Sequence, residues 1–234
     1  MNETKNHLLL LGLLGCLCYG AGDWLMLYGD PTPLSTSYYW LTQGVLQIAP
    51  WRNALAMALA FPGIVCYGVA LFSLERYITG PRARTAYHYL NVFGLTPWMA
   101  LHLFYVMALY LFWHLGNAGD VALAARTTEA LLDHLIWLVP VSEALMLPPF
   151  VYWLYLTAAG KTTLPRWTAA TNVLVIYGVL YGVKMLLPVS AFRLGFTNGL
   201  MSESMAVFFV VLYVVGREGV AGGVGRAGIA GGEG

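Results

Sequence analysis

Residues 8–28 read LLLLGLLGCLCYGAGDWLMLY, an apolar run in which Asp23 is the single charged side chain. A helix needs about 20 apolar residues to cross the hydrocarbon core of a bilayer. Only a helix satisfies its own backbone hydrogen bonds in lipid over a segment of this length. The run therefore predicts a first transmembrane helix over about residues 7–29.

The same region also has features of a cleavable leader. Lys5 precedes four leucines, as in a signal peptide, and residues 13–16 resemble a lipobox that ends at Cys16. The apolar run continues past Cys16 to Tyr28, which is long enough to span a bilayer. We therefore interpret it as a transmembrane helix.

Five further apolar runs follow, at about residues 53–78, 87–115, 128–158, 167–187 and 196–216. Of all residues, 59% are hydrophobic and 10% are charged, whereas soluble domains carry about 25% charged residues. Such a chain cannot supply the charged shell of a soluble domain. We expect an all-α, polytopic bundle of six transmembrane helices over residues 1–216, surrounded by the lipid bilayer. The formal net charge of +1 offers no basic surface for nucleic acid.

Basic residues predict how the bundle is oriented, because they concentrate in cytoplasmic segments. With a cytoplasmic N-terminus, the inner segments hold eight basic residues and the outer loops hold three: Lys5, Arg76, Arg82, Arg84, Lys161, Arg166, Arg217 and Arg226 against Arg52, Arg126 and Arg193. We therefore expect both termini in the cytoplasm and a location in the plasma (inner) membrane. Residues 217–234 are rich in Gly and Ala without periodicity, which predicts a disordered tail.

Small residues mark the helix faces that we expect to pack together. They recur at helical spacing in three of the apolar runs: Gly12, Gly15, Cys16, Tyr19 and Gly22 in the first, Ala56, Ala60, Gly63, Tyr67 and Ala70 in the second, and the GxxxG pair Gly178 and Gly182 in the fifth. Asp23 shares the inward face of the first run.

Polar side chains inside the runs are the candidate site residues, because charge in hydrocarbon is costly and is usually retained for function or pairing. These residues are Asp23, His102, Glu143, Lys184, Asn198, Ser202 and Glu203. Asn198 and Ser202 share one helix face by their spacing of four. The charged members fall in the middle to outer half of the predicted membrane, so we expect one polar pocket that opens outward. We expect no metal, and the residues assign neither a cofactor nor a catalytic role.

Four of these residues also have a plainer explanation. Asp23 is either a buried proton acceptor, metal ligand or general base, or a carboxylate near the interface that reaches water or caps a neighbouring helix. His102 is either part of the pocket or a neutral histidine bonded to a carbonyl or hydroxyl group. Lys184 either pairs with a carboxylate or extends its ammonium to the interface. Glu143, just after a proline, either lines a ligand site or follows a packing kink.

Several short motifs are similar to those of an uncharacterised family of bacterial six-helix integral membrane proteins. The matching residues are Gly22, Asp23, Trp51, Arg52, Pro62, Gly63, Tyr67, Gly68, His102, Asn198, Gly199, Phe208 and Phe209. The resemblance covers most of the chain except the Gly-rich tail. It implies a fold and no activity.

Three functions stay open on the sequence. The first is binding or transport of a small molecule or lipid through the outward polar pocket. The second is a membrane-embedded enzyme acting on a lipid headgroup, with the carboxylates as acid and base. The third is a structural or interaction subunit whose charges hold helices together. The oligomeric state is not determined by the sequence.

Overall fold

The computed structural model describes residues 7–227, with side chains described as far as Arg217. Its helices are α2 (Leu8–Leu27), α3 (Gln43–Gln47), α4 (Trp51–Ser73), η1 (Leu74–Tyr77), α5 (Pro81–Asn117), α6 (Val121–Leu135), α7 (Leu138–Met146), α8 (Pro148–Ala158), η2 (Arg166–Thr171), α9 (Val173–Leu186) and α10 (Ala191–Ala227). Within the described residues there are only isolated β-bridges and no strands. The all-α prediction is therefore confirmed.

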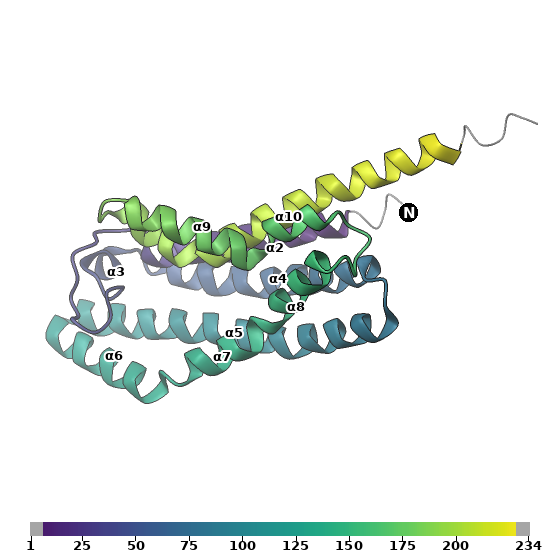
Figure 1. Cartoon of the computed structure of the whole chain (residues 1–234). Coiled ribbons are helices and arrows are strands. Elements are labelled where there is room, and N and C mark those ends of the chain that lie inside the picture. The colour runs from purple at the N-terminus through teal and green to yellow at the C-terminus, as the bar shows by residue number, and fades with distance from the viewer. Residues whose placement is uncertain (1–6, 228–234) are drawn as a thin grey trace, which may run out of the picture.

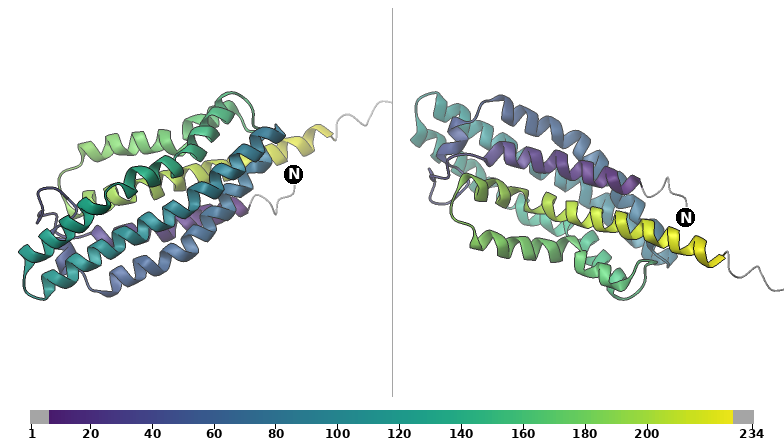
Figure 2. Two further views of the ribbon diagram at one scale, coloured as in Figure 1. Left: turned by 90° about the horizontal axis from the view of Figure 1, so that it is seen from below. Right: turned by 90° about the horizontal axis from the view of Figure 1, so that it is seen from above.

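The helices form two layers along one long axis (Figure 1). In one layer α4, α2, α10 and α9 lie side by side in that order, as Figure 2 shows from above. The other layer holds the long helix α5 and the consecutive helices α6, α7 and α8, which run back along it (Figure 1). Both described ends of the chain lie at the same end of the bundle (Figure 1).

Two clusters of buried side chains hold the layers together. The larger contains Tyr19, Tyr67, Trp98, Phe150 and Phe208, which are all at most 7% exposed. The smaller lies near α3 and α6 and contains Leu41, Val45, Leu109, Phe112 and Leu132. The bundle is thus packed along its length, in the middle by large aromatic rings.

Glycines allow α2 and α4 to approach closely. A Cβ atom on Gly15 would lie 3.0 Å from the carbonyl oxygen of Gly63 and 2.8 Å from the Tyr67 ring. The predicted inward faces of the first two helices are buried, as expected. The GxxxG pair of α9 is not used in this way, because a Cβ on Gly178 or Gly182 would meet nothing within 4 Å.

The predicted fourth span, residues 128–158, is wrong as a single helix. The chain forms α6, α7 and α8 here, and Leu138–Ala158 is the part long and apolar enough to cross a membrane. A proline ring clashes with the carbonyl four residues earlier, so Pro140 disfavours a helix through Ile136. Pro148 and Pro149 break the helix again at Leu147. By contrast, α4 and α5 continue through Pro62 and Pro97.

The predicted fifth span, residues 167–187, begins with the 3-10 helix η2 and continues as α9, which has 14 residues. At 1.5 Å per residue, α9 is about 21 Å long, shorter than the roughly 30 Å hydrocarbon core. The described chain therefore has five helices long and apolar enough to cross a membrane, plus one short apolar helix. Together, η2 and α9 carry the chain back along the bundle (Figure 1).

The last helix is longer than expected. The helical backbone of α10 continues to Ala227, beyond the predicted boundary at residue 216. Residues 228–234 of the predicted disordered tail lie outside the described residues. The disorder of the tail and the cytoplasmic location of both termini stay predictions.

At the end of the bundle where α2 ends, the loop before α3 and the hairpin of α5 and α6 form what we call the polar cap. The tip of α5 and helix α6 form a hairpin there. Asp120 is the N-cap of α6, and its side chain accepts a hydrogen bond from the Leu123 amide. The loop before α3 joins this hairpin, because the Tyr38 hydroxyl donates to Asp133 at 2.7 Å. Since α5 has 37 residues and is thus about 55 Å long, it exceeds the hydrocarbon core.

Candidate functional site

A cavity of about 440 Å³ lies between the two layers of helices. Residues from α2, α5, α7, α9 and α10 line it: Tyr19, Asp23, Trp98, Leu101, His102, Tyr105, Glu143, Met146, Leu147, Leu174, Tyr177, Asn198, Met201 and Ser202. It lies in the half of the bundle nearer the polar cap, because Asp23 is close to the end of α2 and Asn198 is close to the start of α10.

Asp23 joins α2 to α10 at this cavity. Its carboxylate accepts hydrogen bonds from the Asn198 amide at 3.5 Å and from the Ser202 hydroxyl at 3.4 Å. The Asn198 amide also donates to the Asp23 backbone oxygen at 3.2 Å. Asn198 and Ser202 reach the same carboxylate because residues four apart share a helix face. The Asp23 side chain is 14% exposed, so it remains open to the cavity.

His102 lies against the other side of the same carboxylate. Its Nδ1 is 3.6 Å from Asp23 Oδ1, and its Nε2 is 3.4 Å from the carbonyl oxygen of Ala56. A carbonyl oxygen only accepts, so Nε2 carries a hydrogen and donates it. Nδ1 then faces a carboxyl oxygen, and two bare acceptors would repel each other. At 3.6 Å the imidazole and the carboxyl group are beyond hydrogen-bond distance, so they face each other without a direct hydrogen bond.

A second polar contact leads from α4 to Asp23. The Tyr67 hydroxyl donates to the Ser202 oxygen at 3.4 Å, and Ser202 in turn donates to Asp23. Tyr67 stacks on Tyr19 with ring centroids 5.1 Å apart, and Tyr19 meets the His102 ring edge at 4.8 Å. These packed rings hold His102 beside the carboxylate and limit its rotation.

Glu143 reaches the cavity from α7 on the opposite layer. Its side chain is exposed, which places it at the rim, near the buried Met146 and the partly buried Leu147. Tyr177 lines the cavity from α9, a helix in which Val173 alone is buried. Because α9 packs mainly against α10, the cavity wall on this side is thin.

The structure brings five of the seven candidate residues to this cavity, namely Asp23, His102, Glu143, Asn198 and Ser202. Glu203 lies on another face of α10, where Oε1 accepts from the Trp24 indole at 3.1 Å. Its Oε2 is buried without a hydrogen-bond partner among the described residues. Lys184 lies over the Tyr181 ring at 4.7 Å. Among the described side chains no carboxylate is within ion-pair distance of Lys184, so the pairing considered on the sequence is absent.

Four aromatic residues complete the wall, and the sequence reasoning did not include them in the site: Tyr19, Trp98, Tyr105 and Tyr177. Their helical spacing carries a signal that could have found them. Trp98 and Tyr105 lie one turn before and one turn after His102, and Tyr19 lies one turn before Asp23. Residues at that spacing share the face of the polar side chain.

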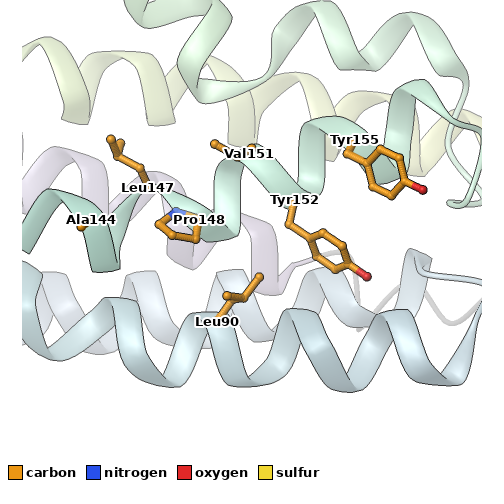
Figure 3. Close-up of a pocket in the computed structure, with 7 residues that line it drawn as sticks. All are labelled: Leu90, Ala144, Leu147, Pro148, Val151, Tyr152 and Tyr155. Atoms are coloured by element: carbon orange, nitrogen blue, oxygen red, sulfur yellow. The ribbon is translucent and has the colours of Figure 1, made fainter.

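A second, apolar groove adjoins the cavity (Figure 3). It has a volume of about 610 Å³ and lies between α5 and the junction of α7 with α8; its lining residues are Leu90, Ala144, Leu147, Pro148, Val151, Tyr152 and Tyr155. Leu147 contributes to both spaces. No charged side chain among the described residues lines the groove, so acyl chains suit its surface.

Among the described residues, no three His, Cys, Asp or Glu side chains gather closely enough to hold a metal ion. The candidate site is therefore a hydrogen-bonded carboxylate and histidine in an aromatic cavity.

The fold and the cavity together define an all-helical protein whose five long apolar helices indicate a multi-pass membrane protein. The chain belongs to a family of unknown function, DUF6796, which matches residues 1–218. The resemblance to an uncharacterised family is thereby confirmed, while the bacterial origin that it implies stays a prediction. Neither the curated proteins nor the solved structures gave a match to the chain.

Proposed function

We propose that this protein binds a small molecule or lipid in the cavity around Asp23, from within the plasma (inner) membrane. The observation that carries the proposal is the convergence of five polar side chains from α2, α5, α7 and α10 on one cavity of about 440 Å³. Small-molecule sites usually enclose about 300–1,000 Å³ and combine apolar walls with a few convergent polar groups.

The cost of the arrangement supports a functional role. A carboxylate inside an apolar bundle is unfavourable, and intramembrane ionisable residues commonly mark ligand or ion pathways. Here the carboxylate is open to the cavity rather than enclosed by its donors. With a cytoplasmic N-terminus, as the basic residues favour, the cavity lies in the outer half of the membrane.

The enzyme alternative has weaker support from the geometry. A general base needs a free nitrogen within hydrogen-bond reach of the substrate proton. In His102, Nε2 faces the Ala56 carbonyl and Nδ1 faces Asp23, so the imidazole is poorly placed as the base, and this alternative rests on the carboxylates of Asp23 and Glu143. The third alternative, helix association, is consistent with the contacts of Asp23 to Asn198 and Ser202. It predicts a loss of stability rather than of ligand binding.

The experiment is a thermal-shift screen of the purified full-length protein in a nonionic maltoside detergent, with lipids and metabolites as probes. We expect a ligand that raises the melting temperature of the wild type and fails to do so for Asp23→Asn. Glu203→Gln is the matched control, because it changes a carboxylate on α10 that does not line the cavity. Equal ligand responses in both variants, or no response to any probe, would contradict the proposal.

A further inference from the structure

The charges of the cavity point to one class of ligand. Two carboxyl groups line it, on Asp23 and Glu143, and no lysine or arginine of the described chain does. We propose that the ligand is an organic cation, an amine or quaternary ammonium group held between these carboxylates and the aromatic wall. This inference rests on the proposed function, because it names the ligand class of the same cavity.

The nearest basic side chains are engaged elsewhere. Arg52 donates to the backbone oxygens of Trp24 at 3.3 Å and Tyr28 at 3.0 Å, where it caps the end of α2. The Lys184 ammonium lies over the Tyr181 ring, one turn of α9 beyond Tyr177. Neither cation lines the cavity, so among the described residues no lysine or arginine faces Asp23 and Glu143 there.

An anionic ligand would therefore be repelled. Like charges close together in a medium of low dielectric constant interact unfavourably, whereas an opposite charge near a carboxylate is stabilised. A neutral ligand would gain contact with the walls but no ionic attraction. The electrostatics thus favour cations over neutral molecules and neutral molecules over anions.

The wall of the cavity suits a cation that carries alkyl groups. Four aromatic side chains contribute to it, from α2, α5 and α9: Tyr19, Trp98, Tyr105 and Tyr177. Cations bind aromatic rings through the ring quadrupole, most strongly where water is excluded, and quaternary ammonium groups are commonly recognised in this way. Met146 and Met201 add polarisable apolar surface that adapts to alkyl groups. A small metal ion would instead require a gathered set of ligands, which the described residues lack.

The titratable groups around Asp23 make cation binding compete with protons. They come from every helix that packs on the site: Tyr19 on α2, Tyr67 on α4, His102 and Tyr105 on α5, Glu143 on α7, Tyr177 on α9 and Glu203 on α10. His102 is the basic member of this set. A proton on the Asp23 carboxyl group would remove the negative charge that attracts a cation, so the proton and the cation compete for this group.

The test compares probes of equal shape and different charge on the purified full-length protein in maltoside detergent. The probes are choline, its uncharged isostere 3,3-dimethylbutan-1-ol, tetraalkylammonium ions from methyl to butyl, and alkyl sulfonates. Binding is measured by calorimetric titration and by melting temperature. We expect binding of at least one ammonium ion, no detectable binding of sulfonates, and binding of the neutral isostere at least tenfold weaker than that of choline.

Paired variants locate the site. Asp23→Asn should weaken ammonium binding at least tenfold, while Glu203→Gln, which does not line the cavity, should weaken it much less. Tyr177→Leu should weaken binding about two- to thirtyfold, the range of a desolvated cation–π contact, while Tyr181→Leu, one turn away and outside the cavity, has little effect. Nanodiscs of phosphatidylglycerol with or without choline- and ethanolamine-headgroup lipids identify the source. Competition by these lipids assigns the cation to a headgroup, and its absence assigns it to a free solute.

The outcomes separate the two proposals. Equal or tighter binding of the neutral isostere or the sulfonates would overturn the cation assignment and leave ligand binding in place. Failure of every probe, charged or not, would overturn both. Equal losses in Asp23→Asn and Glu203→Gln would overturn the assignment of the cation to this cavity.

Discussion

Replacement of Gly15 by alanine should loosen the contact between α2 and α4. The new Cβ would lie 2.8 Å from the Tyr67 ring and 3.0 Å from the Gly63 carbonyl oxygen. Tyr67 is fully buried and stacked on Tyr19, so it cannot swing aside. Overpacking of this kind costs about 1–3 kcal/mol, and the gain in helix propensity from Gly to Ala offsets up to about 1 kcal/mol.

Gly20→Ala in the same helix is the matched control. Its Cβ would meet one side-chain atom, Cβ of Ser202, at an ordinary contact distance of 3.5 Å. Both variants gain the same helix propensity, so the difference between them, about 1–3 kcal/mol, isolates the steric cost. Gly178→Ala in α9 is a second control, because nothing lies within 4 Å of its Cβ.

The assay is reversible unfolding in mixed detergent micelles, followed by tryptophan fluorescence and checked by thermal melts. For a chain of this size, 1 kcal/mol corresponds to about 2–4 °C in melting temperature. Gly15→Ala should melt several degrees below Gly20→Ala, and Gly178→Ala should match or exceed the wild type. The close packing of α2 on α4 would be refuted if Gly15→Ala and Gly20→Ala were equally stable.

Three further predictions follow from other parts of the molecule. The affinity for a tetraalkylammonium ion should fall as the pH is lowered, because protonation removes the negative charge of the Asp23 carboxylate. Calorimetric titration at several pH values checks this, and a flat profile would show that Asp23 does not attract the cation. Asp120→Ala should destabilise the protein by about 1 kcal/mol, because it removes the N-cap of α6. Urea titration of the detergent-solubilised protein measures this loss, and an unchanged stability would show that the N-cap is dispensable. In intact membranes, a membrane-impermeant maleimide should label Arg126→Cys on α6. It should spare Val151→Cys, because Val151 is an exposed residue of the apolar α8 segment. The opposite labelling pattern would disprove the position of the polar cap outside the hydrocarbon.

Periodicity in the sequence predicted the helical class and the packing faces well. Apolar length determines whether a segment can span, so α2 and α4 were found close to their observed bounds, while α5 and α10 are longer than predicted. Small residues at helical spacing identified the buried faces of α2 and α4, because close approach requires them. Proline effects were less predictable, since Pro62 and Pro97 lie within continuous helices while Pro140 and Pro148 accompany breaks.

The site was predictable only in part. Intramembrane charge marked Asp23, His102 and Glu143 as candidates, because burial of such groups is costly wherever they lie. Their common depth followed from the span boundaries. Lys184 and Glu203 have similar depth, yet they face away from the cavity. Depth along the membrane is a one-dimensional quantity, and it does not say which helices are neighbours.

The sequence by itself therefore indicated a lipid environment and most of the helices, because composition and apolar run length depend on each segment alone. The tertiary structure decided which polar groups meet. It placed α10 beside α2, so that Asn198 and Ser202 reach Asp23, and it set His102 of α5 against the same carboxylate. Helix neighbours depend on contacts between residues far apart in the chain, here up to 179 positions for Asp23 and Ser202, and no local pattern encodes them.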